Sequence, residues 1–150
     1  MNRTLLFFIL LIWIPVAAQA SDGLITLKSP HSVPETADRL EKALMDKGMK
    51  IFSRIDHAAG AARAGLTLRP TVLIIFGNPK IGSKLMQCDQ KTAIDLPMKA
   101  LVYQDDSGTT WLSYNSPAWL ASRHNLAACQ PVLDKVGKAL AGFAASATTP

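Results

Sequence analysis

Residues 56–65 read DHAAGAARAG, so the imidazole of His57 is followed by a stretch that consists mainly of alanine and glycine. Alanine and glycine reduce the bulk of a chain, so the backbone here could approach a neighbouring segment or a ligand closely. One interpretation is a lid or pocket wall in which His57 contacts the bound molecule. The other is an Ala-rich helical turn or connector that Asp56 caps and that packs tightly. The helix-tolerant composition favours the second interpretation and leaves the first open.

Other polar side chains stand where a ligand could reach them. Arg69 precedes a predicted strand and offers five N–H donors to a carboxylate, for which Asp95 is the natural partner. Tyr114 lies in a predicted hairpin strand, either as a packing residue or as a pocket-lining one. His124 ends a short predicted helix, where a cation also suits the helix dipole. With the turn residue Asn78, the candidate ligand-binding residues are His57, Arg69, Asn78, Asp95, Tyr114 and His124.

Catalytic and metal-binding motifs are not readable in the sequence. No serine lies in a G-x-S-x-G motif. The three histidines are far apart and lack the H-x-H, E-x-x-H or C-x-x-C-H spacing of zinc and haem sites. We therefore predict no catalytic residues, no metal ligands and no cofactor. A small hydrolase-like enzyme that uses His57 as a general base, with Asp95 or Arg69 nearby, remains an alternative.

Cys88 and Cys129 are the two cysteines of the chain. In an oxidising compartment only one pairing is possible, and it would close a loop of about 40 residues. The loop-entropy model assigns such a bridge roughly 4 kcal/mol of stabilisation. We favour a disulfide, with two buried free thiols or a redox-active or metal-binding pair as the alternatives.

The first twenty residues have the three-part pattern of a secretory signal peptide. Arg3 is followed by an apolar run and then by the small residues Ala18 and Ala20, which predicts cleavage after Ala20. We therefore expect a periplasmic protein with no integral membrane segment after cleavage. The formal charge of +5 becomes +4 once Arg3 is removed. These charges are scattered and no basic block occurs, so we do not expect nucleic-acid binding.

Hydrophobic periodicity predicts five strands and four helices in the rest of the chain. The run at 71–76 is continuously apolar and β-branched, which is typical of a central strand buried on both faces. Ser32 and Glu35 form a predicted capping box for the first helix. The predicted strands are 24–28, 49–55, 71–76, 100–104 and 110–114. The predicted helices are 33–47, about 83–91, 117–123 and about 131–144, followed by a disordered tail from about 146.

This order of elements predicts one α+β domain over residues 21–150. Its strands do not alternate with helices as βαβ units do, so we expect an antiparallel sheet with one face turned to helices. The long last helix is the expected cover. Any pocket is expected between that helix and the sheet.

Two long runs closely resemble the bacterial family named domain of unknown function 302. They are IDHAAGAARAGLTLRPTVLIIFGNPKIGSKLMQ and AIDLPMKALVYQDDSGTTWLSYNSPAWLASRH. The shared pattern includes the Asp-His start, L-R-P-T, F-G-N-P, L-M-Q, I-D-L-P and the final R-H, and the resemblance covers about residues 24–144. Ser83 and Ser116 stand where Thr and Asp are common in the family.

What this resemblance implies is a fold. It is a β-α-β4-α helix-grip arrangement, similar to the TATA-binding-protein-like class, in which a curved sheet wraps on a long helix. It implies no activity. We therefore predict a non-enzymatic domain that binds a small apolar or anionic ligand between sheet and helix, with a homodimerising interaction module as the second possibility.

Overall fold

A five-stranded antiparallel sheet forms the centre of the computed structural model, which describes residues 23–150. The predicted signal segment, residues 1–20, lies outside the described residues. The strand order across the sheet is β1-β5-β4-β3-β2. The strands are β1 (Leu24–Ser29), β2 (Lys50–Asp56), β3 (Thr71–Gly77), β4 (Met98–Gln104) and β5 (Thr110–Asn115).

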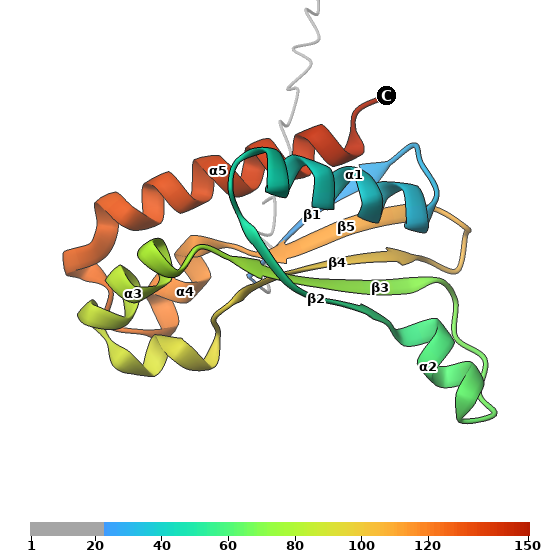
Figure 1. Cartoon of the computed structure of the whole chain (residues 1–150), viewed down its shortest axis with the longest axis horizontal. Helices are drawn as coiled ribbons and strands as arrows, with labels where there is room; N and C mark the ends of the chain where they lie inside the picture. The colour runs from blue at the N-terminus through green and yellow to red at the C-terminus, as the bar shows by residue number, and fades with distance from the viewer. Residues whose placement is uncertain (1–22) are drawn as a thin grey trace, which may run out of the picture.

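Within residues 23–150, five α-helices and two short 3₁₀ helices connect or follow the strands. They are α1 (Val33–Asp46), α2 (His57–Arg63), α3 (Pro79–Cys88), η1 (Gln90–Ile94), α4 (Pro117–Arg123), η2 (Ala127–Cys129) and α5 (Gln130–Thr148). The two longest, α1 and α5, lie on the same face of the sheet (Figure 1). Within residues 23–150 no helix has both the length and the apolar character needed to cross a membrane. The predicted α+β class, with an antiparallel sheet and a long C-terminal helix, is confirmed.

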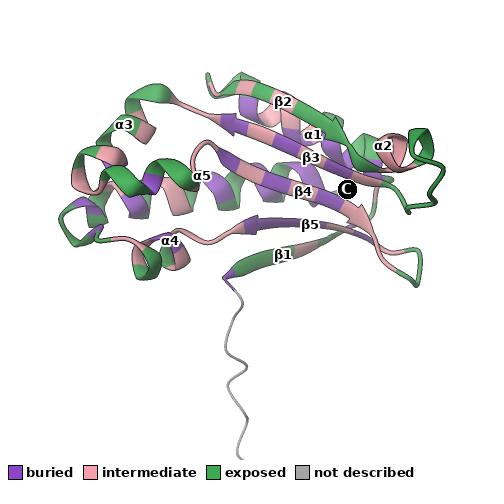
Figure 2. Ribbon diagram, turned by 90° about the horizontal axis from the view of Figure 1, so that it is seen from below, coloured by how far each residue is buried: buried purple, intermediate pink, exposed green. Residues whose placement is uncertain are grey.

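The hydrophobic core fills the space between the sheet and the two long helices. Leu40 and Leu44 of α1 meet Ile74, Val102 and Leu112 from three adjacent strands, and all of these side chains are fully buried. Cross-strand register places Ile74 opposite Ala100 and Val102 opposite Leu112, so the inward residues form continuous rows. The opposite face of the sheet has no helical layer over it, as the view from below shows (Figure 2).

This one-sided cover corrects the prediction that β3 is buried on both faces. Its buried residues alternate with half-buried ones: Val72, Ile74 and Phe76 are buried, whereas Leu73 and Ile75 are only partly covered. The apolar run predicts a strand correctly. It does not reveal that both long helices pack on the same side.

Two helix boundaries also differ from those predicted. Helix α3 begins at Pro79 because the side chain of Asn78 accepts a hydrogen bond from the N–H of Lys80, at 3.0 Å, and caps the helix. Helix α5 continues to Thr148, so the expected disordered tail from about residue 146 is wrong. Arg39 of α1 donates to the carbonyl oxygen of Thr149 at 2.7 Å and fixes this end of the chain.

The capping box of α1 forms only in part. The Ser32 hydroxyl accepts a hydrogen bond from the N–H of Glu35 at 3.3 Å, as predicted. The carboxylate of Glu35, however, lies 3.0 Å from Nδ1 of His31.

Strand β2 contains a bulge that the alternating pattern does not predict. Ile51 pairs with Phe76 and Ser53 pairs with Ile75, so one extra residue, Phe52, is inserted between them. The bulge reverses the faces of the residues that follow. Ile55 therefore lies on the open face, and not on the same face as Ile51 as the sequence predicted.

The β4–β5 hairpin is organised around the carboxylate of Asp105. One oxygen accepts the indole N–H of Trp111 at 2.7 Å, and the other accepts both the hydroxyl and the N–H of Ser107. These hydrogen bonds, the one from Trp111 foremost, lower the pKa of Asp105 from 3.8 to about 2. The hairpin therefore depends on the ionised carboxylate.

Substituting Asp105→Ala is expected to destabilise the protein at neutral pH and progressively less in acid. Because the folded pKa lies below the unfolded one, the contribution of this carboxylate is complete above about pH 3.8 and disappears as the pH falls through about 2. Denaturant unfolding followed by tryptophan fluorescence at several pH values measures the difference from the wild type. Asp106→Ala, at a side chain that is 88% exposed, is the control and should change little. A difference that stays constant down to pH 2 would contradict this account.

Candidate functional site

A cavity of about 540 Å³ lies between α3 and α5 at the end of the sheet where β3 stops and β4 starts. Its walls are almost entirely apolar. Leu85 and Met86 of α3 face Val136 and Leu140 of α5, and Phe76 closes the side nearest the sheet. The volume is within the range of natural small-molecule pockets, which is about 300–1,000 Å³. The predicted place, between the long helix and the sheet, is close to the observed one, but α3 supplies a wall that the sequence did not predict.

The bulge in β2 and two glycines shape this cavity. Phe52, the inserted residue, lines it although its side chain is still 45% exposed. Gly77 lines the cavity beside Phe52 and Pro97, and a Cβ atom there would make ordinary contacts with both, at 3.5 Å. Gly82 of α3 also lines the cavity, and a Cβ there would make only an ordinary contact with Leu96, at 3.8 Å.

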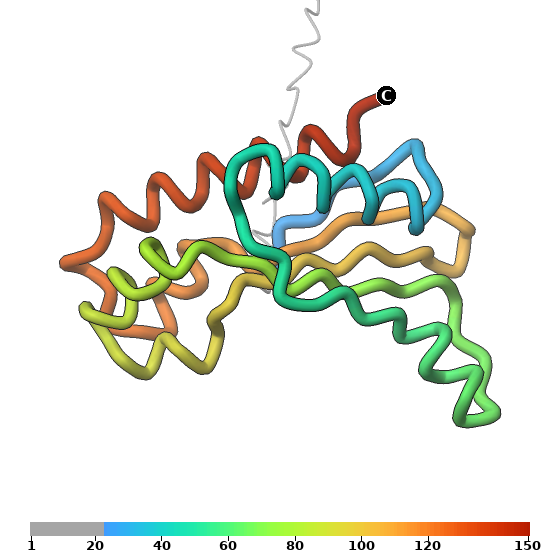
Figure 3. Tube along the Cα trace, viewed as in Figure 1, coloured from blue at the N-terminus to red at the C-terminus, as the bar shows by residue number. Residues whose placement is uncertain are grey.

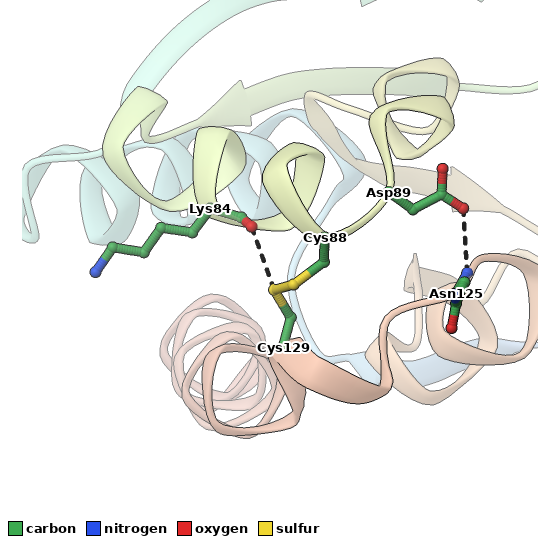
Figure 4. The surroundings of a disulfide bond; sticks show 5 residues. All are labelled: Lys84, Cys88, Asp89, Asn125 and Cys129. Carbon is green, nitrogen blue, oxygen red and sulfur yellow. Dashed lines mark hydrogen bonds between the residues drawn. A yellow bond between two sulfur atoms is a disulfide. The ribbon is translucent and has the colours of Figure 1, made fainter.

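A disulfide between Cys88 and Cys129 ties the two helical walls together. The predicted pairing is confirmed: the S–S distance is 1.97 Å and the two cysteines are 41 positions apart. Cys88 ends α3 and Cys129 immediately precedes α5 (Figure 4). Sγ of Cys129 lies 3.2 Å from the carbonyl oxygen of Lys84. A disulfide sulfur carries no hydrogen, so this is a close packing contact.

Asp89, the residue after Cys88, makes a second link beside the disulfide. Its carboxylate accepts the N–H of Lys91 at 3.0 Å and the N–H of Asn125 at 3.2 Å. These two backbone hydrogen bonds lower the pKa of Asp89 below its usual value of 3.8. The chain after α3 is thereby held to the segment that leads into α5.

Of the six candidate residues, Asn78 alone lines the cavity. Its side chain is already used as the cap of α3, so its contribution to the site is to fix where that helix begins. Tyr114 lies on the helix-covered face of β5, is 5% exposed, and is not among the lining residues. Burial raises the pKa of its hydroxyl above 10. Tyr114 is therefore a packing residue of the core.

The predicted pair of Arg69 and Asp95 does not form. Arg69 makes an ion pair with Asp106 and donates from Nε to the carbonyl oxygen of Gln104 at 3.1 Å. Asp95 instead contacts His124, with 2.6 Å between Oδ2 and Nε2, and Arg123 at 3.4 Å. Two residues that were predicted separately, Asp95 and His124, are thus brought together. Their side chains are 13% and 6% exposed, so the pair joins η1 to the end of α4 in a largely buried place.

His57 lies far from these groups. It begins α2, which Asp56 caps by accepting the N–H of Ala59 at 2.8 Å, as the structural interpretation of DHAAGAARAG predicted. The trace shows α2 and the segment that contains Asp95 at opposite ends of the molecule (Figure 3). His57 is exposed and, among the described residues, has no hydrogen bond or ion pair with another side chain. It does not line this cavity, so the proposed site contains no contact with His57, and the lid interpretation stays a prediction.

Most of the residues that line the cavity were not predicted from the sequence. Phe52, Gly82 and Leu85 received no role there, because cavity walls and core positions have the same apolar pattern. One signal was present. The run FGNPKIG contains two glycines on either side of a helix start that Asn78 and Pro79 define, and both glycines line the cavity.

This fold, an antiparallel sheet covered on one face by helices, is shared with one recognised class of domains. Residues 25–143 match the domain of unknown function DUF302, and the chain belongs to that family. In structure it is similar to an uncharacterised conserved DUF302 protein from Bacillus stearothermophilus, with a TM-score of 0.76 and 23% identity over 85% of this chain and 99% of that one.

Part of this chain is also similar to longer proteins that have been named. The chain is 51% identical over 112 residues to the fluoride-specific ion channel FluC 1 of Brucella suis biovar 1 (strain 1330) and to FluC 1 of Brucella abortus biovar 1 (strain 9-941). The match covers 75% of this chain but only 44% and 42% of those proteins. It therefore spans less than half the length of the channels.

Proposed function

We propose that this DUF302 protein is an exported, non-enzymatic domain that binds a small apolar molecule in the cavity between α3 and α5. The observation that carries the proposal is the cavity itself, about 540 Å³ in volume and lined by apolar side chains from two helices and three strands. Well-packed domains rarely leave so large an apolar space without a use. The named function of the channel relatives belongs to proteins more than twice as long as the matched segment and is not part of the proposal.

The chemistry of the lining favours binding over catalysis. The potential nucleophiles among the lining residues are the hydroxyl of Ser83 and the amines of Lys84 and Lys135, and no histidine or carboxylate lies in the lining to activate them. The pair of Asp95 and His124 could move a proton in principle, but Asp95 does not line the cavity and His124 borders a separate shallow depression. Substrate held between α3 and α5 would have no activated group to react with.

A dye-binding titration tests the proposal. The neutral dye N-phenyl-1-naphthylamine fluoresces in apolar surroundings and should bind the wild-type protein at one site. Gly82→Trp should abolish this binding, because the indole would project into the cavity. Gly142→Trp is the matched control: Gly142 is also in a helix, its Cβ would meet nothing within 4 Å, and it lies outside the cavity. Absence of saturable binding to the wild type, or equal binding to both variants, would contradict the proposal.

Export is the second part of the proposal, and it is supported by the pattern of residues 1–20 and by the disulfide. Intact-mass measurement of protein recovered from its own cell envelope tests it. The expected mature chain begins at Ser21 and carries one disulfide. A chain that retains residue 1 with two free thiols would contradict export.

A homodimer is the second candidate, because one face of the sheet is uncovered. Leu73, Leu101 and Ile55 lie side by side in the cross-strand register on that face, and Ile55 is 37% exposed. Light scattering distinguishes the candidates. A monomer mass would leave the cavity as the functional site, whereas a dimer that Leu73→Lys converts to monomer would favour an interaction module.

A further inference from the structure

The charged side chains that line the cavity are both cations. They are Lys84 on α3 and Lys135 on α5, which come from the two facing walls. No aspartate or glutamate is among the lining residues. Both lysines are exposed, so their aliphatic stems belong to the rim while their ammonium groups remain in water.

Neither ammonium group has a partner within residues 23–150. Elsewhere in the described residues some cations are paired: Arg54 lies 2.5 Å from Asp38, and Lys42 lies 2.8 Å from Asp46. No hydrogen bond or ion pair from the described residues involves Nζ of Lys84 or Lys135. Two unpaired positive charges at the rim of an apolar cavity favour a ligand that has an apolar body and a negative end.

We infer that the ligand is a free single-chain anionic amphiphile, a molecule with an aliphatic chain and a terminal carboxylate. This inference rests on the proposed function and specifies its ligand. The aliphatic chain occupies the space among Phe76, Leu85 and Leu140, where burial of its methylene groups supplies most of the affinity. The carboxylate remains at the rim and makes ion pairs with Lys84 and Lys135. These pairs are solvent-exposed, so they select the ligand and add a modest gain in affinity.

Three compounds with the same twelve-carbon chain test the inference: laurate, dodecanol and dodecyltrimethylammonium. Each is titrated below its micelle concentration against the protein loaded with N-phenyl-1-naphthylamine, and dye displacement gives the dissociation constant. Laurate is expected to bind about five- to tenfold more tightly than dodecanol, since each exposed ion pair contributes a few tenths to 1 kcal/mol. Dodecyltrimethylammonium is expected to bind more weakly than dodecanol.

Two variants locate the effect. The double variant Lys84→Gln/Lys135→Gln should bind laurate about as weakly as dodecanol, while its affinity for dodecanol stays that of the wild type. Lys138→Gln is the matched control, because Lys138 is an exposed lysine of α5 that does not line the cavity. It should keep the preference for laurate.

The outcomes separate the inference from the proposal on which it rests. If the dye binds and all three compounds displace it equally, the cavity binds apolar molecules and the inference about charge is wrong. If neither the dye nor any compound binds, the proposed function itself fails. If the protein does not bind free laurate but sediments with vesicles of phosphatidylglycerol, the lysines recognise a membrane surface and the inference is overturned.

Discussion

Replacing both Cys88 and Cys129 by alanine is expected to lower the free energy of unfolding by about 4 kcal/mol. The two cysteines are 41 positions apart, and the loop-entropy model gives roughly this value for a loop of that length. The loss is a large fraction of the roughly 5–15 kcal/mol that typically stabilises a domain. It should be felt most in α3, because the disulfide joins the end of this helix to the start of α5.

Denaturant unfolding of the oxidised wild type and of the double variant measures the effect. The control is the wild type in excess reductant, which should unfold at nearly the same denaturant concentration as the variant. A thiol count on the unreduced wild type should find no free thiol. A loss of less than about 1 kcal/mol would mean that the loop is already restricted in the unfolded chain, and the entropic account would then fail.

Leu40→Ala is expected to cost about 2–5 kcal/mol. Leu40 lies in α1, is 2% exposed, and packs in the core formed with the inner face of the sheet. Truncation removes buried methyl groups and leaves a void that the surrounding strands fill only in part. The same substitution should leave the secondary structure intact, because alanine is the best helix-forming residue.

Leu66→Ala provides the comparison for Leu40→Ala. Leu66 follows α2 and is 67% exposed, so its truncation should change the free energy of unfolding by no more than about 0.5 kcal/mol. Thermal or chemical unfolding of the two variants gives both values. Equal effects at the two positions would contradict the assignment of Leu40 to the core between α1 and the sheet.

Much of the fold could be predicted because it depends on local patterns. Ser32 and Pro34 mark the start of α1, and residues 105–108 mark the hairpin turn, where both strands end close to the predicted places. The family resemblance added the helix-grip arrangement, in which the sheet wraps on a long helix. The prediction that Ile51 and Ile55 share one face of β2 failed because an alternating pattern contains no signal for a bulge. The bulge inserts Phe52, so the residues after it lie on the opposite face of the sheet from the one predicted.

The candidate site was harder to predict because it depends on contacts between distant segments. Arg69 and Asp95 have complementary charges, yet Arg69 pairs with Asp106 in the turn between β4 and β5. Asp95 pairs instead with Arg123 and His124. Charge type alone cannot choose among such partners. The wall that α3 supplies could not be predicted either, since the width of the cavity depends on how far α3 lies from α5.

The disulfide has a further consequence, which concerns thermodynamic linkage. Cys88 and Cys129 join the two helices that line the cavity, so this bond holds both walls that the proposed ligand would touch. Linkage is reciprocal: the factor by which oxidation favours binding is the factor by which binding favours oxidation. If oxidation favours binding, the protein with its cavity filled resists reducing agents better than the empty protein, and occupancy is read from the ease with which one sulfur–sulfur bond is broken.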